Sequence, residues 1–197
     1  MIDNTDAVKL LDSKRNDAVF VATMNANNVN FGLPTITTNE KLDFPVSGAM
    51  SKASSVALGL ALAQLDRKVL CLDGDGSLLM NLGALVTVSD KAPKNLVHVL
   101  FNNKVYAVTG GQPIPGSEKV DWVGMARSAG YASVFSFDNL EDMTNGIDET
   151  PAAEGPVFVH LLVKPEIENT PVQFRTPAKR TVHNAINDLS ETLGVKR

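Results

Sequence analysis

Short apolar runs recur along the chain and are separated by longer segments that mix apolar and polar positions. Each run is bounded by polar or glycine-rich residues, which is typical of a strand. We therefore expect strands over residues 18–23, 44–50, 68–72, 96–101, 132–137 and 156–163. Most of these runs are apolar at consecutive rather than alternate positions, and such strands are typical of a parallel sheet that is buried on both faces.

The segments between the apolar runs predict helices that cover this sheet. The expected helices span residues 3–15, 51–64, 77–89, 120–129, 139–149 and 178–193. We expect residues 25–39 to form a loop with one helical turn, and residues 109–116 a loop, because they include two prolines and three glycines. The alternation of strands and helices predicts an α/β fold, with a parallel sheet covered by helices on both faces. We expect residues 1–197 to form a single domain with an extension from about residue 165 to 197 that carries the last helix.

Length and composition agree with one globular domain. The 197 residues are 44% hydrophobic and 20% charged, which is ordinary for a folded domain. The formal net charge of −4 does not favour a nucleic-acid-binding protein, which usually carries a basic excess. No apolar run is long enough to span a bilayer. The one cysteine, Cys71, excludes an internal disulfide and a cysteine-based metal cluster. We therefore expect a soluble cytoplasmic protein.

Candidate chemistry follows the third expected strand, at the segment from Gly74 to Ser77. Parallel sheets bind ligands at the carboxyl ends of their strands. The amides at the start of the next helix attract anions, and the Ser77 hydroxyl can add a further contact. Asp75 is the unexpected member, because a carboxylate repels phosphate. A divalent cation between the two resolves the conflict, and Mg²⁺ prefers oxygen ligands.

A second polar segment, Asn102 and Asn103, ends the next expected strand. Two parallel strands joined by one helix place their carboxyl ends side by side, so Asp75 and Asn103 would face one ion. Twenty-five residues separate Gly76 from Asn102, and this spacing resembles the GDG…NN cofactor motif of the thiamine-diphosphate enzymes. The alternative is that both segments are only turns.

The resemblance implies a thiamine-diphosphate-binding fold and a set of cofactor ligands. Mg²⁺ would be held against the diphosphate by Asp75, by the side chain of Asn103 and by the carbonyl of Val105. The diphosphate and the rest of the cofactor would be contacted by Gly74, Gly76, Ser77 and Tyr106.

The resemblance also implies contacts to the other parts of the cofactor. In the family, a glycine carbonyl accepts a hydrogen bond from the aminopyrimidine, and a large apolar residue bends the cofactor into a V. Gly48 and Met50 match these two positions and are the expected catalytic residues, although Met50 is alternatively a core residue. Thr23 and Asn25 match a loop that contacts the diphosphate, but Met24 stands where the family often has glycine.

The segment from Thr109 to Pro113, with the sequence TGGQP, narrows the resemblance to the sulfopyruvate and phosphonopyruvate decarboxylases. The Thr/Pro-rich tail around Arg175 is similar to theirs as well. The resemblance implies an anionic 2-oxoacid substrate such as 3-sulfopyruvate, with Gly111, Gln112 and Arg175 as candidate contacts. Further basic groups near the site are Lys104, Lys179 and Arg180, for each of which a solvated surface charge is the alternative.

A pyrimidine-binding domain, which supplies an activating Glu in the family, has no counterpart in this sequence. The resemblance therefore implies that this chain is the β half of a hetero-oligomer, a dimer of heterodimers or larger, whose α subunit supplies that Glu. Two alternatives stay open within the enzymes, a phosphonopyruvate decarboxylase half and an acetolactate-synthase-like carboligase half. A third is a non-catalytic cofactor-binding assembly subunit.

Several residues of reactive or aromatic type are expected to have only packing or solvated roles. His98 and His160 lie in expected core strands, Cys71 is expected to be a buried thiol, and Trp122 is expected to be a packing or interface residue. His183 is expected to be solvated on the last helix.

Overall fold

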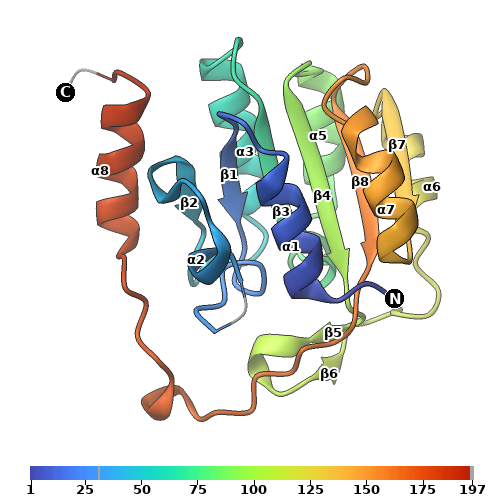
Figure 1. Ribbon diagram of the computed structural model, residues 1–197. Coiled ribbons are helices and arrows are strands. Elements are labelled where there is room, and N and C mark those ends of the chain that lie inside the picture. The colour runs from blue at the N-terminus through green and yellow to red at the C-terminus, as the bar shows by residue number, and fades with distance from the viewer. Residues whose placement is uncertain (31, 196–197) are drawn as a thin grey trace.

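The computed structural model describes residues 1–30 and 32–195. Its centre is a six-stranded sheet in which every pairing is parallel and the strand order is β2-β1-β3-β4-β8-β7 (Figure 1). The strands are β1 (Val19–Ala22), β2 (Asp43–Pro45), β3 (Val69–Gly74), β4 (Leu96–Asn102), β7 (Ser133–Phe137) and β8 (Val157–Leu162). A separate antiparallel hairpin is formed by β5 (Val105–Tyr106) and β6 (Gln112–Pro113).

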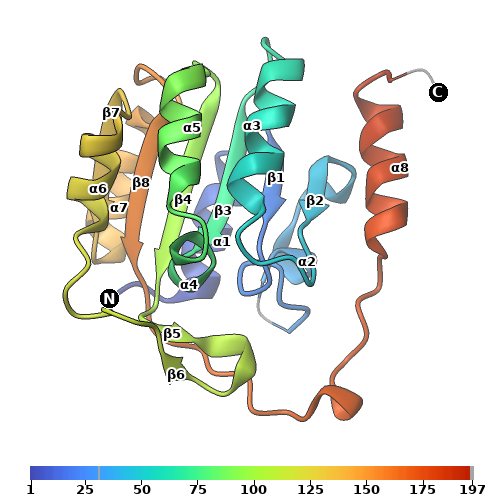
Figure 2. The same cartoon turned by 180° about the vertical axis from the view of Figure 1, so that it is seen from behind.

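Helices cover both faces of the sheet. One face packs against α1 (Asn4–Ser13), α2 (Leu33–Ile36) and α7 (Leu140–Gly146) (Figure 1). The other face packs against α3 (Ala53–Ala63), α5 (Gly83–Lys91) and α6 (Trp122–Ala129) (Figure 2). The short helix α4 (Asp75–Leu79) follows β3 directly, and α8 (Val182–Thr192) packs beside β2 at the edge of the sheet. Short 3-10 helices lie at Glu40–Leu42, Ala107–Thr109, Ile147–Glu149 and Val172–Phe174.

Strand alternation divides the core into these two layers. Within β3, Leu72 packs into the layer under α1 and α7, while its neighbour Cys71 packs into the layer under α3, α5 and α6. In β4, Val99 and Leu100 divide in the same way. Because both side-chain sets are buried, the central strands need apolar residues at consecutive positions, which explains the pattern of the sequence.

The expected α/β fold with a parallel sheet is confirmed. Strand 44–50 was expected too long, since β2 ends at Pro45 and the chain then turns. The helix expected over 77–89 is interrupted between Leu79 and Gly83, where the Asn81 side-chain amide donates to the Ser51 carbonyl at 3.4 Å. The loop expected over 109–116 includes β6, because a proline lacks only a donor and can lie in a two-stranded hairpin.

The topology brings three strand ends together. The register pairs Ala22 with Leu72 and Gly74 with Phe101, so the segments after β1, β3 and β4 leave the sheet side by side. The β5–β6 hairpin lies beyond these ends, and the segment after β8 passes along it toward α8 (Figure 1). The backbone N–H of Glu168 in this segment donates to the Ala107 carbonyl at 2.8 Å. In the described part of the chain, every helix is too short or too polar to cross a bilayer.

Candidate functional site

A cavity of about 510 Å³, partly open to solvent, lies at the carboxyl edge of β1, β3 and β4. Ten of the residues singled out from the sequence line it: Thr23, Asn25, Met50, Gly74, Asp75, Gly76, Ser77, Asn103, Val105 and Tyr106. Of the other candidate cofactor and substrate residues, Gly48, Gly111, Gln112 and Arg175 are outside this lining. The structure therefore brings the candidate cofactor and metal residues together, apart from Gly48, and leaves the candidate substrate residues outside.

Asp75 is the buried carboxylate of this cavity. Its Oδ1 accepts the backbone N–H of Gly76 at 2.8 Å, and its Oδ2 accepts the backbone N–H of Lys104 at 2.6 Å. Lys104 has a positive φ of 67°, which directs the chain after β4 back toward Asp75. Burial raises the pKa of Asp75 to about 6 in spite of these hydrogen bonds. A cation beside the carboxylate would favour its charged form, so the cavity is suited to a positive ligand.

Asn103 directly follows β4, the parallel neighbour of β3, and is buried as well. Its Oδ1 accepts the backbone N–H of Val105 at 3.0 Å, which fixes the orientation of the side-chain amide. The cavity lining thus combines a carboxylate and a side-chain amide, and these oxygen ligands fit a hard cation such as Mg²⁺.

The turn around Gly76 is packed too closely for any side chain. A Cβ at Gly76 would lie 2.6 Å from Cε1 of Tyr106, so only glycine lets the tyrosine ring close against the turn. The Ser77 hydroxyl accepts the backbone N–H of Ser51 at 3.0 Å. This bond links the GDGS turn to the segment that carries Met50.

The two residues after β1 are partly engaged by the protein itself. The Thr23 hydroxyl donates to the Leu72 carbonyl at 3.1 Å, so it would have to turn to donate to a diphosphate. The Asn25 amide donates to Oδ1 of Asn4 at 3.4 Å, while Oδ1 of Asn25 is buried without a hydrogen-bond partner. Asn25 therefore has an acceptor to offer a ligand.

The segment from Gly48 to Met50, called here the open end, is a turn that contributes Met50 to the cavity lining. Gly48 has a positive φ of 68° and is exposed, with open space where a Cβ would lie. Met50 is half-buried and lines the cavity together with Val46, which is buried. The long thioether of Met50 is able to support an aromatic ring system placed above it.

The candidate substrate residues have structural partners. The Arg175 guanidinium donates to the carbonyls of Val108 and Thr170 at 2.9 and 2.7 Å, which fastens the segment after β8 to the hairpin. Oε1 of Gln112 accepts the Thr109 hydroxyl at 3.2 Å. A Cβ at Gly111 would lie 2.6 Å from the Ile167 side chain, so this glycine permits the same close approach.

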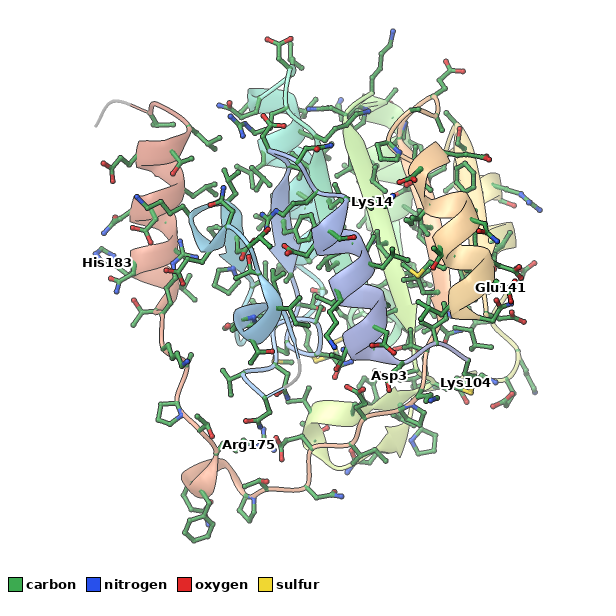
Figure 3. All side chains as sticks on the ribbon, viewed as in Figure 1. Asp3, Lys14, Lys104, Glu141, Arg175 and His183 are labelled. Carbon is green, nitrogen blue, oxygen red and sulfur yellow. The ribbon has the colours of Figure 1, made fainter. Side chains whose placement is uncertain are left out.

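The other basic residues do not gather around the cavity. Lys104 pairs with Glu118 at 2.8 Å, and Figure 3 shows Lys104 and Arg175 well apart along this edge of the molecule. Arg180 pairs with Asp188 at 2.9 Å and lines a second cavity with Lys179, beside β2.

Five further lining residues were not proposed as ligands from the sequence: Met24, Val46, Ala107, Val108 and Thr109. Four of them are apolar, and the local sequence does not distinguish an apolar residue that lines a cavity from one that packs in the core. The available indication was that these residues are close in sequence to Thr23, Gly48 and Tyr106.

Comparison with known proteins agrees with this geometry. The family model described as "Thiamine pyrophosphate enzyme, C-terminal TPP binding domain" matches residues 22–161, a span that contains every strand end around the cavity. The sulfopyruvate decarboxylase subunit beta of Methanothermobacter thermautotrophicus is 36% identical over 176 residues, which cover 87% of this chain and 88% of that protein.

Other relatives are longer than this chain. The phosphonopyruvate decarboxylase of Streptomyces viridochromogenes is 43% identical over 122 residues, which are 62% of this chain and 30% of that protein. The sulfopyruvate decarboxylase of Methanosarcina acetivorans is 31% identical over 98% of this chain, which spans 47% of its length. Among solved structures, a thiamine diphosphate-dependent 4-hydroxybenzoylformate decarboxylase of Rhodococcus jostii superposes with a TM-score of 0.70 at 21% identity, over 85% of this chain and 33% of that one. That likeness concerns the fold alone.

Proposed function

Because this chain belongs to the thiamine pyrophosphate enzymes through their C-terminal TPP-binding domain, we propose that it is the cofactor- and Mg²⁺-binding subunit of a 2-oxoacid decarboxylase. The observation that carries the proposal is the buried Asp75 carboxylate beside Asn103, at the carboxyl ends of β3 and β4. Both lie within the span that the family model matches. We also treat residues 1–197 as one TPP-binding domain with a C-terminal extension from about residue 165.

The metal would be held by Asp75, by the Asn103 side chain and by the Val105 carbonyl. The amides of the short GDGS turn, together with the Ser77 hydroxyl, would face the diphosphate. Thiamine diphosphate, when bound, supplies the electron sink that lets a 2-oxoacid lose CO₂. The role of this chain is to hold that group in place, and most of the required donors are already oriented by backbone hydrogen bonds.

Gly48 and Met50 would act at the aminopyrimidine end of the cofactor. The Gly48 carbonyl would accept a hydrogen bond from the amino group, and Met50 would support the bend between the two rings. Met50 lines the cavity, which supports its part of this assignment. Gly48 lies outside the lining, in the exposed turn next to it, so its part depends on what closes the open end.

A partner chain would complete the site. Among the described residues that line the cavity, Asp75 is the only acid, and it is assigned to the metal. The carboxylate that activates the aminopyrimidine therefore has to come from another chain. We propose an α subunit with a pyrimidine-binding domain that supplies this Glu, in a dimer of heterodimers or a larger assembly. Similarity to proteins named as beta subunits, over most of this chain, supports it.

The cytoplasmic location expected from the sequence stays a prediction.

We propose 3-sulfopyruvate as the substrate, which would yield sulfoacetaldehyde and CO₂. The support is the similarity over 88% of the length of a sulfopyruvate decarboxylase subunit beta. A second candidate, 3-phosphonopyruvate, is favoured by the higher identity of 43% over a shorter span. Gly111, Gln112 and Arg175 stay candidates for contact with the acidic group of either substrate.

The test is to co-express the chain with a candidate α subunit and to measure CO₂ release from 3-sulfopyruvate, 3-phosphonopyruvate and pyruvate, with and without Mg²⁺ and cofactor. Preference for 3-sulfopyruvate supports the proposal. Preference for 3-phosphonopyruvate, or carbon–carbon ligation of pyruvate, would contradict 3-sulfopyruvate as the substrate and support that other reaction instead. Tight cofactor binding without turnover of any 2-oxoacid would instead favour a non-catalytic assembly subunit.

A further inference from the structure

Three buried polar side chains form a line beneath the cavity. Asp73 lies on β3, His98 lies on the neighbouring strand β4, and Tyr131 precedes β7. Asp73 and His98 are 1% and 0% exposed, and Tyr131 is 5% exposed. All three lie in the layer under α5 and α6, and none of them lines the cavity.

The three side chains lie in contact end to end. The Tyr131 hydroxyl is hydrogen-bonded to Nδ1 of His98 at 2.9 Å. Nε2 of His98 lies 3.4 Å from Oδ2 of Asp73, a close polar contact in which neither atom forms a hydrogen bond. Oδ1 of Asp73 accepts the backbone N–H of Gly74 at 2.9 Å. The line therefore ends at the peptide between Asp73 and Gly74, one residue before Asp75.

Packing alone does not call for these residue types. The aromatic rings do pack, since His98 and Tyr131 meet Phe158 edge-on at 5.3 and 5.4 Å between ring centroids. A carboxylate and a hydroxyl add nothing to such contacts, and burying them is costly unless they are hydrogen-bonded. Here the Tyr131 hydroxyl and Oδ1 of Asp73 each have a hydrogen-bond partner.

We infer that Asp73, His98 and Tyr131 are positioning residues for the metal-binding turn, which they act on through the Gly74 peptide. With that peptide held by Asp73, Asp75 enters the cavity from a fixed direction and meets the Gly76 and Lys104 amides. Tyr131 and His98 act indirectly, because they hold the Asp73 carboxylate in the rotamer that reaches Gly74. The inference rests on the proposed role of Asp75 as a metal ligand, and it extends that site into the core.

The competing explanation is a second metal site. The ligand atoms of Cys71, Asp73 and His98 lie within 4.8 Å of one another. All three residues are fully buried, however, and the described chain adds no fourth His, Cys, Asp or Glu to the group. A closed metal site needs four ligands and an entry path. The line of polar contacts needs neither, and it accounts for Tyr131 as well.

The primary test is Tyr131→Phe, which removes one hydroxyl and keeps the ring. In the complex with its partner, we expect the Mg²⁺ concentration for half-maximal cofactor binding to rise by about tenfold, as for other groups that orient metal ligands. Turnover at saturating Mg²⁺ should stay close to that of the wild type. Asp73→Asn, which keeps an acceptor for Gly74 but loses the carboxylate, should shift the Mg²⁺ requirement in the same direction.

The matched control is Phe158→Leu. This side chain packs against the same two rings but forms no hydrogen bond in the line. We expect it to lower the melting temperature and to leave the Mg²⁺ requirement unchanged. A purely structural role for Tyr131 would instead make both variants behave alike.

A second measurement does not depend on metal or cofactor. In the metal-free chain, amide hydrogen exchange over Gly74 to Gly76 should accelerate in Tyr131→Phe and not in Phe158→Leu. If wild-type protein bound no Mg²⁺, the proposed function would fail, while this exchange experiment would still test the positioning line. Unchanged exchange and an unchanged Mg²⁺ requirement in Tyr131→Phe would overturn the inference. So would a stoichiometric transition metal in purified protein that is lost in Cys71→Ala.

Discussion

The two ends of the cavity are built in opposite ways. At the metal end, Asp75 and Asn103 are buried, and their side-chain oxygens accept backbone hydrogen bonds of 2.6 to 3.0 Å. At the other end, Gly48 is exposed and Met50 is half-buried, in a turn with left-handed φ angles of 68° at Gly48 and 71° at Ser51. One end lies against the sheet, and the other is a turn beyond it.

This difference suggests how the work is divided between chains. The metal end draws its groups from neighbouring strands and from the turns that follow them, so a single chain is able to assemble it. The open end lacks an acid of its own and exposes the groups that would meet the aminopyrimidine. The metal end is complete within this chain, whereas the open end lacks the activating carboxylate. This arrangement suits a subunit whose partner chain supplies that carboxylate. The predictions below test each side of this contrast.

The largest effect is expected at the metal end. Asp75→Ala removes the only acid among the described residues that line the cavity, so it should abolish Mg²⁺-dependent cofactor binding while the fold stays intact, as checked by circular dichroism. Calorimetric titration of cofactor into the complex with its partner measures the loss. The matched control is Asp90→Ala, which removes an exposed acid on α5 and should bind as the wild type does. Unchanged cofactor affinity in Asp75→Ala would mean that Asp75 does not bind the metal.

The next effect concerns the open end as a whole. The isolated chain should show no decarboxylase activity, and adding the partner should restore it, because the activating carboxylate is then supplied. Mg²⁺ and cofactor should tighten the assembly, since a ligand held between two chains stabilises the bound state. Size-exclusion chromatography and turnover assays on the chain with and without the partner decide this. Full activity from the chain alone would show that no second chain is needed and would contradict this division of the site between chains.

A smaller effect is expected within the open end. Met50→Ala should keep most of the cofactor affinity, because the diphosphate anchor is at the other end. Turnover should fall on the order of 100-fold, since positional slack near 1 Å at the reacting groups has about that cost. Met50→Leu, which preserves most of the bulk, should recover much of the rate. Wild-type turnover in Met50→Ala would mean that Met50 has only a packing role.

The smallest effect is a pH dependence of the metal end. Burial raises the pKa of Asp75 to about 6, so the metal-free carboxyl is mostly protonated below that pH and mostly ionised above it. A cation binds the ionised form and must release the proton. Titration with Mn²⁺ in buffers of different ionisation enthalpy should therefore report most of one proton released at about pH 5.5 and almost none at about pH 7.5. A release that does not change with pH would mean that Asp75 is not the group that meets the cation.

Much of this architecture was predictable from the sequence because the signals are local. The apolar runs at 68–72 and 96–101 and the glycines after Leu72 indicate strands and a turn without knowledge of any partner. The family match confirms the cofactor that the GDG and NN spacing indicated. The same local reasoning erred where long-range contacts decide: the helix expected over 77–89 is broken beside Asn81, whose side chain bonds to Ser51, 30 residues earlier.

The residue types at the carboxyl edge, their order and their spacing were determined by the sequence alone. Only the tertiary structure decided how these groups are held: Lys104 donates to Asp75 from 29 positions away, Ser51 donates to Ser77 across 26, and His98 faces Asp73 through the register of β3 and β4. The physical reason is that periodicity and turn chemistry depend on neighbours in the chain, whereas burial and hydrogen-bond partners depend on which strands lie side by side.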